Sequence, residues 1–362
     1  MDNKKSNSVL LDGVRSALIA FLITLGFSLV ISIIFNISFF EDFNNLMSGN
    51  LGGDKGATAT SIVRITVMIF NFSLFNTVGT IKFGIIIFIF IPVISFWLAN
   101  KQIDRNGDMG SSNIIVYVIS SFIFALLQFF ISLITKGNLV EGIPINFATF
   151  NNLLTTFILS LLIQIFIKLN YKSDTKNGGI NAFKNTYRIM GLIGTVIILT
   201  GLILGFGNYS KHGILIIIAI ILMLPNMIAY SFFYMIGLTM EFNDKLQEVL
   251  NKYINIDLTF ENNMYIRYLA IIIFILIVAY VGYKMDKEKL IRNTIIYSVS
   301  LGLFIGTLGY CSSINFIDID FIGSIEFSIS SILLSTIIPF VTVWIIVLIY
   351  YLIKKVKDII KE

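Results

Sequence analysis

Residues 112–135 read SNIIVYVISSFIFALLQFFISLIT, a run that contains no charged side chain. About 20 apolar residues are enough to carry an α-helix across the hydrocarbon core of a bilayer. Runs of this kind recur along the chain, and eight of them qualify as spans: residues 15–37, 83–99, 112–135, 149–169, 189–207, 265–283, 293–311 and 328–353. The sequence therefore predicts an all-α integral membrane protein, built as a polytopic helical bundle.

The composition of the whole chain agrees with this prediction. Of the 362 residues, 56% are hydrophobic and 13% are charged, whereas a soluble domain is about one quarter charged. These few charged side chains cannot cover the surface of the protein. The expected partner is therefore the lipid bilayer and not a nucleic acid. The first span is too long for a signal-peptide core and no cleavage site follows it, so we expect it to be retained.

Two further apolar segments, residues 61–79 and 213–240, are expected to dip into the membrane and return on the same side. The first is interrupted by Arg64, Asn71 and Asn76. The second carries Leu224-Pro225-Asn226 near its middle, where proline should break the helix.

Charge placement favours these dips over full crossings. Loops rich in Lys and Arg tend to stay in the cytoplasm, and the clearest ones are residues 168–188, residues 284–292 and the carboxyl-terminal tail. All three share one side only if 213–240 makes no net crossing. The prediction is eight spans and two dips in the cell membrane, with both termini cytoplasmic. The alternative is ten spans.

The two halves of the chain resemble each other. At a fixed offset of 180 residues, 13 of the 46 positions in 113–158 are identical to those in 293–338. This predicts a first membrane repeat over residues 1–170, a cytoplasmic basic linker over 171–188 and a second repeat over 189–362. Four crossings in each half make the repeats parallel, whereas five make them inverted.

The dips supply most of the candidate functional residues. Both contain the pattern Ser-x-Phe-x-x-x-Gly, and non-helical backbone at membrane depth must be buried in protein or line a cavity. The candidates for a pore or repeat interface are these six residues and two mid-span glutamines: Ser73, Phe75, Gly79, Ser231, Phe233, Gly237, Gln128 and Gln164. The alternative for the dips is packing without a solute path, and for the glutamines hydrogen bonding between helices.

Three basic residues near the expected outer boundary form a second candidate feature: Arg64, Lys82 and Arg267. They either reach along the helix to the interface or form a basic outer mouth that attracts anions. Two outer loops also have regular patterns. Residues 241–254 have the spacing of an amphipathic helix, and residues 314–321 alternate like a short strand.

The residues that are missing from the spans limit the chemistry. No span has Asp or Glu in its apolar interior, which argues against a proton relay. Cys311 and His212 are single, so no disulfide or Cys- or His-based metal site is expected, and we predict no cofactor, no metal and no enzymatic activity.

Two functions fit this pattern. The first is a membrane transport protein, or the permease-like subunit of a bacterial-type transporter with unknown substrate, in which case a separate ATPase or membrane partner subunit supplies energy. The alternative is a non-transporting scaffold or regulatory subunit of an envelope complex.

Overall fold

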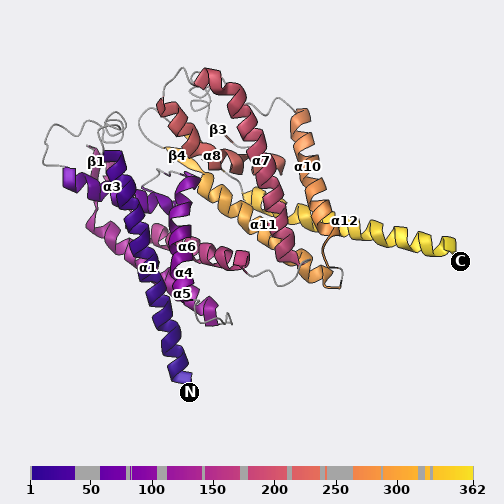
Figure 1. The fold of residues 1–362 in the computed structure, drawn as a ribbon, viewed down its shortest axis with the longest axis horizontal. Coiled ribbons are helices and arrows are strands. Elements are labelled where there is room, and N and C mark those ends of the chain that lie inside the picture. Colours follow the sequence, from indigo (N-terminus) through magenta and orange to yellow (C-terminus); the bar gives the residue numbers. More distant parts are fainter. Residues whose placement is uncertain are drawn as a thin grey trace. The chain divides into compact units, whose positions relative to one another are not determined.

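The computed structural model shows a predominantly helical chain in two compact units, Met1–Lys168 and Leu169–Glu362 (Figure 1). Each unit is described by itself. The structure describes residues 2–36, 58–78, 82, 84–103, 112–140, 143–171, 178–209, 214–236, 241–242, 264–286, 288–316, 323–326 and 329–361.

The first unit is built around a long amino-terminal helix. This helix packs against α3, α4 and α5 (Figure 1), and its apolar part, Ser8–Ile34, is 27 residues long. The β1 and β2 strands form an antiparallel hairpin between α5 and α6. The elements are α1 (Asp2–Asn36), α3 (Thr58–Ser73), η3 (Ile86–Ile89), α4 (Phe90–Ile103), α5 (Ser112–Ile134), β1 (Gly137–Val140), β2 (Ile143–Ile145) and α6 (Phe150–Tyr171).

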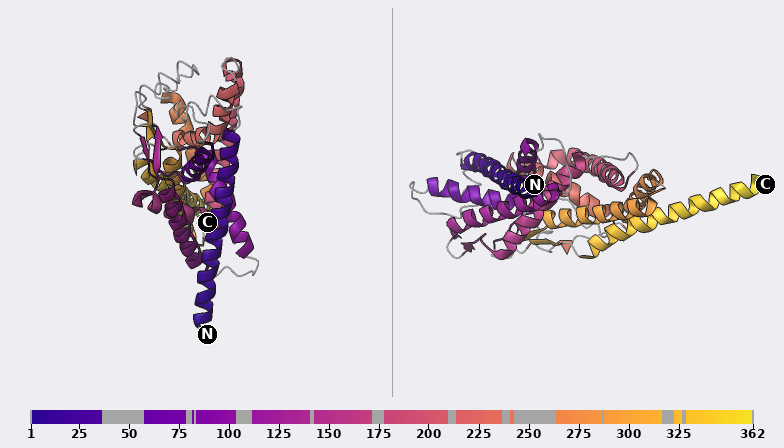
Figure 2. Two further views of the ribbon diagram at one scale, coloured as in Figure 1. Left: turned by 90° about the vertical axis from the view of Figure 1, so that its left-hand side faces the viewer. Right: turned by 90° about the horizontal axis from the view of Figure 1, so that it is seen from below.

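The α-helices of the second unit follow one another as those of the first do, with strand β3 where the first unit has η3. Its helix α7 packs against α8, α10 and α11, and α12 packs against α10 and α11 before it extends past them (Figure 2). Strand β5 lies between β3 and β4 in a small antiparallel sheet. The elements are α7 (Gly179–Tyr209), α8 (Ile214–Met235), β3 (Glu241–Phe242), α10 (Met264–Tyr283), α11 (Leu290–Ser312), β4 (Ile314–Phe316), β5 (Gly323–Glu326) and α12 (Ile329–Lys361).

The helices have the inside-out polarity of a membrane protein. Large apolar side chains lie on the surface, such as Leu22 at 64% exposed and Ile203 at 74%, while Thr24 and Ser28 are fully buried. Four helices in the described part of the chain are long and apolar enough to cross a bilayer: Ser8–Ile34, Ile114–Ile134, Phe150–Lys168 and Leu290–Ser312. The chain is therefore a helical membrane protein. The number of eight spans stays a prediction.

Two local expectations were wrong. Pro225 lies inside α8, which continues unbroken from Ile214 to Met235. A proline removes one helix hydrogen bond, and a membrane helix tolerates that loss where neighbours compensate for it. Glu241 and Phe242, expected at the start of an amphipathic helix, form β3 and pair with β5, because β5 offers an edge to their backbone. The rest of that expected helix lies outside the described residues.

The expected strand near residue 314 is present in part. Residues Ile314–Phe316 form β4, which pairs antiparallel with β5. The turn between the two strands lies outside the described residues.

Candidate functional site

A cluster of phenylalanine rings marks the middle of the first unit. The Phe124 ring lies 6.3 Å from Phe21 of α1, 5.9 Å from Phe70 of α3 and 4.9 Å from Phe96 of α4, measured between ring centroids. Phe21 and Phe124 stand near the midpoints of the apolar parts of α1 and α5. The Phe70 end of α3 therefore lies at mid-depth of this helical unit.

Helix α3 reaches this depth from the end of α1. The Ser32 hydroxyl donates a hydrogen bond of 3.0 Å to the Ile62 carbonyl, and the Phe21 and Phe70 rings are 5.4 Å apart. Helix α3 thus runs antiparallel to the second half of α1 and ends beside the midpoint of α1. This is the course expected of a segment that enters from one side and stops halfway.

The chain leaves α3 through a capping motif of two backbone hydrogen bonds. The Asn76 N–H donates to the Asn71 carbonyl at 3.1 Å and the Phe75 N–H to the Phe72 carbonyl at 3.0 Å. This is the Schellman pattern, in which the residue after the cap adopts the left-handed conformation and is usually glycine. Here that residue is Phe75, with φ of 56° and a fully buried side chain.

Polar side chains surround this turn and form what we call the Asn71 network. The side-chain amide of Asn71 donates to the Ser132 hydroxyl at 3.1 Å. The side-chain oxygen of Asn71 accepts from the Asn76 side-chain amide at 2.9 Å and from the Gln128 side-chain amide. The Gln128 amide also donates to Ser132 at 3.1 Å. All four residues are at least 98% buried, so the hydrogen bonds replace the water that these groups have lost.

Helix α6 completes the network and clamps the backbone after the turn. The Asn152 amide donates to the Thr77 carbonyl at 2.8 Å, and the Thr77 N–H donates back to the Asn152 side-chain oxygen at 2.9 Å. The Asn76 amide reaches the Thr156 hydroxyl at 3.0 Å. Gln128 and Thr156 each lie six residues from their helix ends, or about 9 Å inside them, whereas Ser132 and Asn152 lie two residues from theirs, or about 3 Å inside.

The chemistry of the Asn71 network is that of neutral amides and hydroxyls. It contains no charged group, and no group of three potential metal ligands occurs in the part of the chain that the structure describes. The side-chain oxygen of Gln128 is buried without a hydrogen-bond partner among the described residues. Such a set can exchange hydrogen bonds with a neutral polar molecule, but it has no group to carry a proton.

The second unit has a counterpart at the offset of 180 residues that pairs Phe124 with Phe304. The Phe304 ring lies 5.5 Å from Phe183 and 5.5 Å from Tyr187 of α7, and 6.4 Å from Phe232 of α8. In both units, rings from the first helix and from the helix after it therefore pack on the matched phenylalanine. The same offset pairs Ser132 with Ser312, whose carbonyl accepts a hydrogen bond of 3.0 Å from the Tyr230 hydroxyl of α8.

The serines and phenylalanines proposed from the dips lie at or near the ends of α3 and α8. Ser73 is fully buried and donates to the Phe70 carbonyl at 2.7 Å. Ser231, near the end of α8, donates to the Ile228 carbonyl at 2.7 Å. Phe233 is fully buried like Phe75. The paired glycines, Gly79 and Gly237, lie outside the described residues.

The two mid-span glutamines are both fully buried. Gln128 belongs to the Asn71 network, whereas the Gln164 amide donates to the Ser121 hydroxyl of α5 at 2.8 Å. Both amides therefore bridge helices, as the packing alternative expects. A role of either in a pore stays a prediction.

The predicted basic mouth is described only in part. Arg64 is exposed on α3, whereas Lys82 is only 9% exposed. The side chain of Arg267 lies outside the described residues. The mouth stays a prediction, and Lys82 is more enclosed than a residue at an open rim is expected to be.

Sequence reasoning missed the partners that complete the Asn71 network. Asn71 and Asn76 were noted only as polar interruptions of residues 61–79, and Ser132, Asn152 and Thr156 were not singled out. Asparagine inside an apolar run is the signal that was available, because such a group must find a partner in the membrane.

Comparisons with known proteins add no family to this description: no family model, no curated protein and no solved structure matches the chain.

Proposed function

We propose that this chain is a membrane transport protein, or the permease-like subunit of one, and that the Asn71 network is where the solute makes contact. One observation carries the proposal: the last residues of α3 reach mid-depth of their unit, and the non-helical turn that follows is surrounded by neutral hydrogen-bonding groups. Interrupted helices near the bilayer midplane are where many transporters bind their substrates.

The arrangement of helix ends in the first unit supports α3 as a dip. The start of α1 lies against the first half of α5, since a Cβ on Gly13 would come within 2.7 Å of Ile119. The Ser16 hydroxyl donates to Asn100 near the end of α4 at 3.1 Å. If α1 and α5 cross the bilayer, then the end of α1, the start of α3 and the end of α5 share the opposite side, and α3 makes no net crossing.

The second unit supports the same course for α8. A Cβ on Gly179 would come within 2.2 Å of the Asn293 carbonyl oxygen, so the starts of α7 and α11 lie together. Strand β3 follows α8 and pairs with β5, which follows α11. Only four residues join α7 to α8, too few to cross a bilayer. We infer that α8 begins and ends on one side although it is continuous.

The proposed architecture is therefore two parallel repeats, each with four crossings and one dip, and with both termini in the cytoplasm. The shared order of α-helices, the ring clusters on Phe124 and Phe304 and the contacts to Ser132 and Ser312 support it. That the two dips meet at an interface stays a prediction.

The network also indicates the class of solute. Neutral amides and hydroxyls suit a small neutral polar molecule. A charged solute would lack a counter-charge at this depth, and unpaired charge inside a membrane costs several kcal/mol. With no carboxylate in the network, the chain would work either downhill or with a separate ATPase.

The test measures solute flux into proteoliposomes. The readout is the rate of osmotic swelling when urea, glycerol or erythritol is added. Replacement Gln128→Leu should lower swelling at least tenfold relative to the wild-type chain. The matched control is Gln164→Leu, which removes a second buried glutamine outside the network and should retain flux. Equal loss in both variants would show that the effect is not specific to the network.

Water access provides a second readout that does not need a partner subunit. In a Cys311→Ser background, a cysteine at Thr77 should react with a membrane-impermeant thiol reagent, because Thr77 is only half-buried in the turn. A cysteine at Ser121, which is buried beside Gln164, is the control and should stay unreactive.

A scaffold is the second candidate, and the completeness of the hydrogen bonding in the network favours it. Almost every polar atom there already has a partner within the unit, as expected of a packing device. Under this function Thr77→Cys stays unreactive, and no solute swells the proteoliposomes faster than empty vesicles. Gln128→Leu then changes only the melting temperature.

A further inference from the structure

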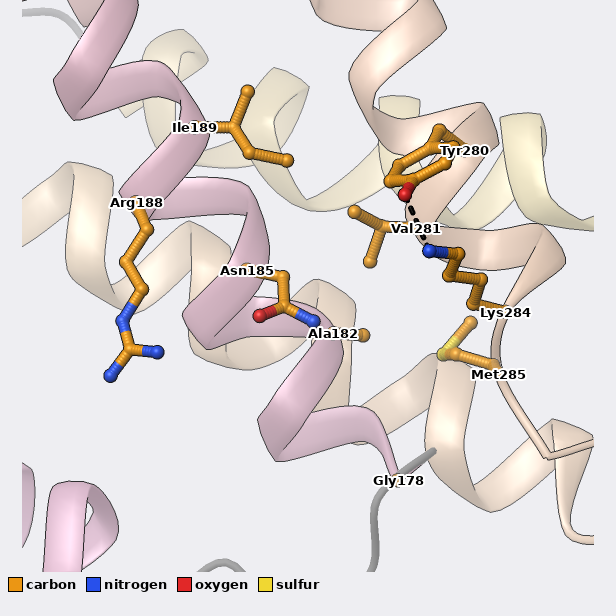
Figure 3. Close-up of a pocket in the computed structure, with 9 residues that line it drawn as sticks. All are labelled: Gly178, Ala182, Asn185, Arg188, Ile189, Tyr280, Val281, Lys284 and Met285. Atoms are coloured by element: carbon orange, nitrogen blue, oxygen red, sulfur yellow. Dashed lines mark hydrogen bonds between the residues drawn. The ribbon is translucent and has the colours of Figure 1, made fainter.

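A pocket of about 340 Å³ opens between the start of α7 and the end of α10, both in the second unit (Figure 3). Its size lies in the range of small-ligand sites. Asn185 of α7 and Lys284 of α10 point into the space between the two helices, whereas Arg188 also lines the pocket but its guanidinium points away from Lys284. Val281 and Met285 supply an apolar wall, and both are buried.

The polar groups of the pocket are donors and cations. The Lys284 ammonium lies 4.3 Å from the centre of the Tyr280 ring and donates a hydrogen bond to the Tyr280 hydroxyl, which holds it at the mouth. Asn185 and Arg188 are exposed. No Asp or Glu is among the described residues that line the pocket.

The charges around the pocket are also mainly positive. Lys184 lies one residue before Asn185 and is 5% exposed; burial, and then the nearby Arg188, lower its pKa. The nearest acidic residue in sequence, Asp286, accepts a hydrogen bond of 3.1 Å from the Glu288 N–H. An anion in the pocket would relieve this repulsion between cations.

The pocket lies where two apolar helices meet basic segments. Residues 168–188 and 284–292 are the loops expected in the cytoplasm. The apolar part of α7 begins beside the first loop, and that of α10 ends beside the second. Basic pockets between helices at the cytoplasmic surface suit anionic lipid head groups, and Arg and Lys are the usual phosphate donors.

We propose that this pocket binds a phosphate-bearing anion at the membrane surface through Lys284 and Asn185, with Arg188 adding positive charge nearby. The phosphate group belongs either to an anionic phospholipid or to a soluble phosphate. The apolar wall suits the glycerol and first methylenes of a lipid. This inference is independent of the transport proposal, since it concerns another unit and a stability readout.

The experiment measures the melting temperature of the full chain in neutral detergent with phosphatidylglycerol, phosphatidylcholine or inorganic phosphate added. Phosphatidylglycerol should raise the melting temperature by about 5 °C at a hundredfold excess over Kd, and phosphatidylcholine should not. Lys284→Gln should at least halve the shift. Asn185→Asp, at an exposed position where folding is not at risk, should abolish it by repulsion.

The matched control is Lys289→Gln, which removes an exposed lysine at the same end of the unit but outside the pocket, and it should keep the full shift. If inorganic phosphate gives the larger shift with the same dependence on Lys284, the site stands and its ligand is soluble. The proposal is overturned if neither phosphate source raises the melting temperature. It is equally overturned if all variants respond as the wild type does.

Discussion

At the scale of single residues, Phe75 combines an unfavourable backbone conformation with a favourable burial of its side chain. Its φ of 56° is unfavourable for a side chain with a Cβ, at a cost of about 1–2 kcal/mol, while its ring is fully buried, and burial of a phenylalanine is worth about 3–5 kcal/mol. Phe75→Gly should therefore lower the free energy of unfolding by about 1–4 kcal/mol, because the lost packing outweighs the relieved backbone. Thermal melting in detergent measures this, with Phe75→Leu as the milder control; a rise on Phe75→Gly would show that backbone strain dominates.

The same residue shows where sequence reasoning stops. No local sequence preference indicates that Phe75 adopts a positive φ, because glycine is the usual residue in this conformation. Burial of the Phe75 ring, which depends on the tertiary fold, favours the residue there in spite of its φ. Asn152 and Thr156 lie 75 and 80 residues from their partners, so only the tertiary fold brings them to the network.

At the scale of elements, close helix packing depends on glycine at a few positions. A Cβ on Gly179 would meet the backbone oxygen of Asn293 at 2.2 Å, whereas one on Gly26 would meet nothing within 4 Å. Gly179→Ala should therefore destabilise the chain by about 1–3 kcal/mol, as overpacking does. Gly26→Ala should be neutral or stabilising by up to about 1 kcal/mol. Thermal melting of the two variants in parallel tests the contact, and equal behaviour would contradict it.

The lengths of the apolar runs predicted that the chain is helical, but they did not predict which helices continue through a proline. Pro225 was expected to break 213–240, yet α8 continues through it. The membrane makes an unpaired backbone group so costly that a helix is kept wherever neighbours can cover the missing bond. Sequence preference alone does not include those neighbours.

At the scale of the whole molecule, the proposed eight crossings give a labelling pattern. In a Cys311→Ser background, cysteines at the exposed residues Asn185 and Glu288 should react with an impermeant reagent from the same side, the cytoplasm. A cysteine at Lys136, exposed after α5, should react only from the other side. Labelling of Asn185 and Glu288 from opposite sides would favour ten crossings and inverted repeats.

That the chain is a membrane protein could be predicted from its apolar runs, because runs of this length match the thickness of a bilayer. The repeat stays a prediction. It rests on a weak sequence match at one offset, on a similar order of α-helices in the two units and on the ring contacts of Phe124 and Phe304. Under the transport proposal, solute identity depends on the few side chains that surround the turn after α3, and composition does not indicate it.

The apolar part of α1 has a consequence for the choice of bilayer. Its 27 residues make a rod of about 40 Å, against a typical hydrocarbon thickness of about 30 Å. Such hydrophobic mismatch is relieved by tilting the helix or by thickening the lipid around it. Because α3, α4 and α5 all pack on α1, a tilt of α1 turns the whole first unit with it. The tilt of the first unit should therefore depend on the acyl-chain length of the lipid. It should be small in a thick bilayer and larger in a thin one.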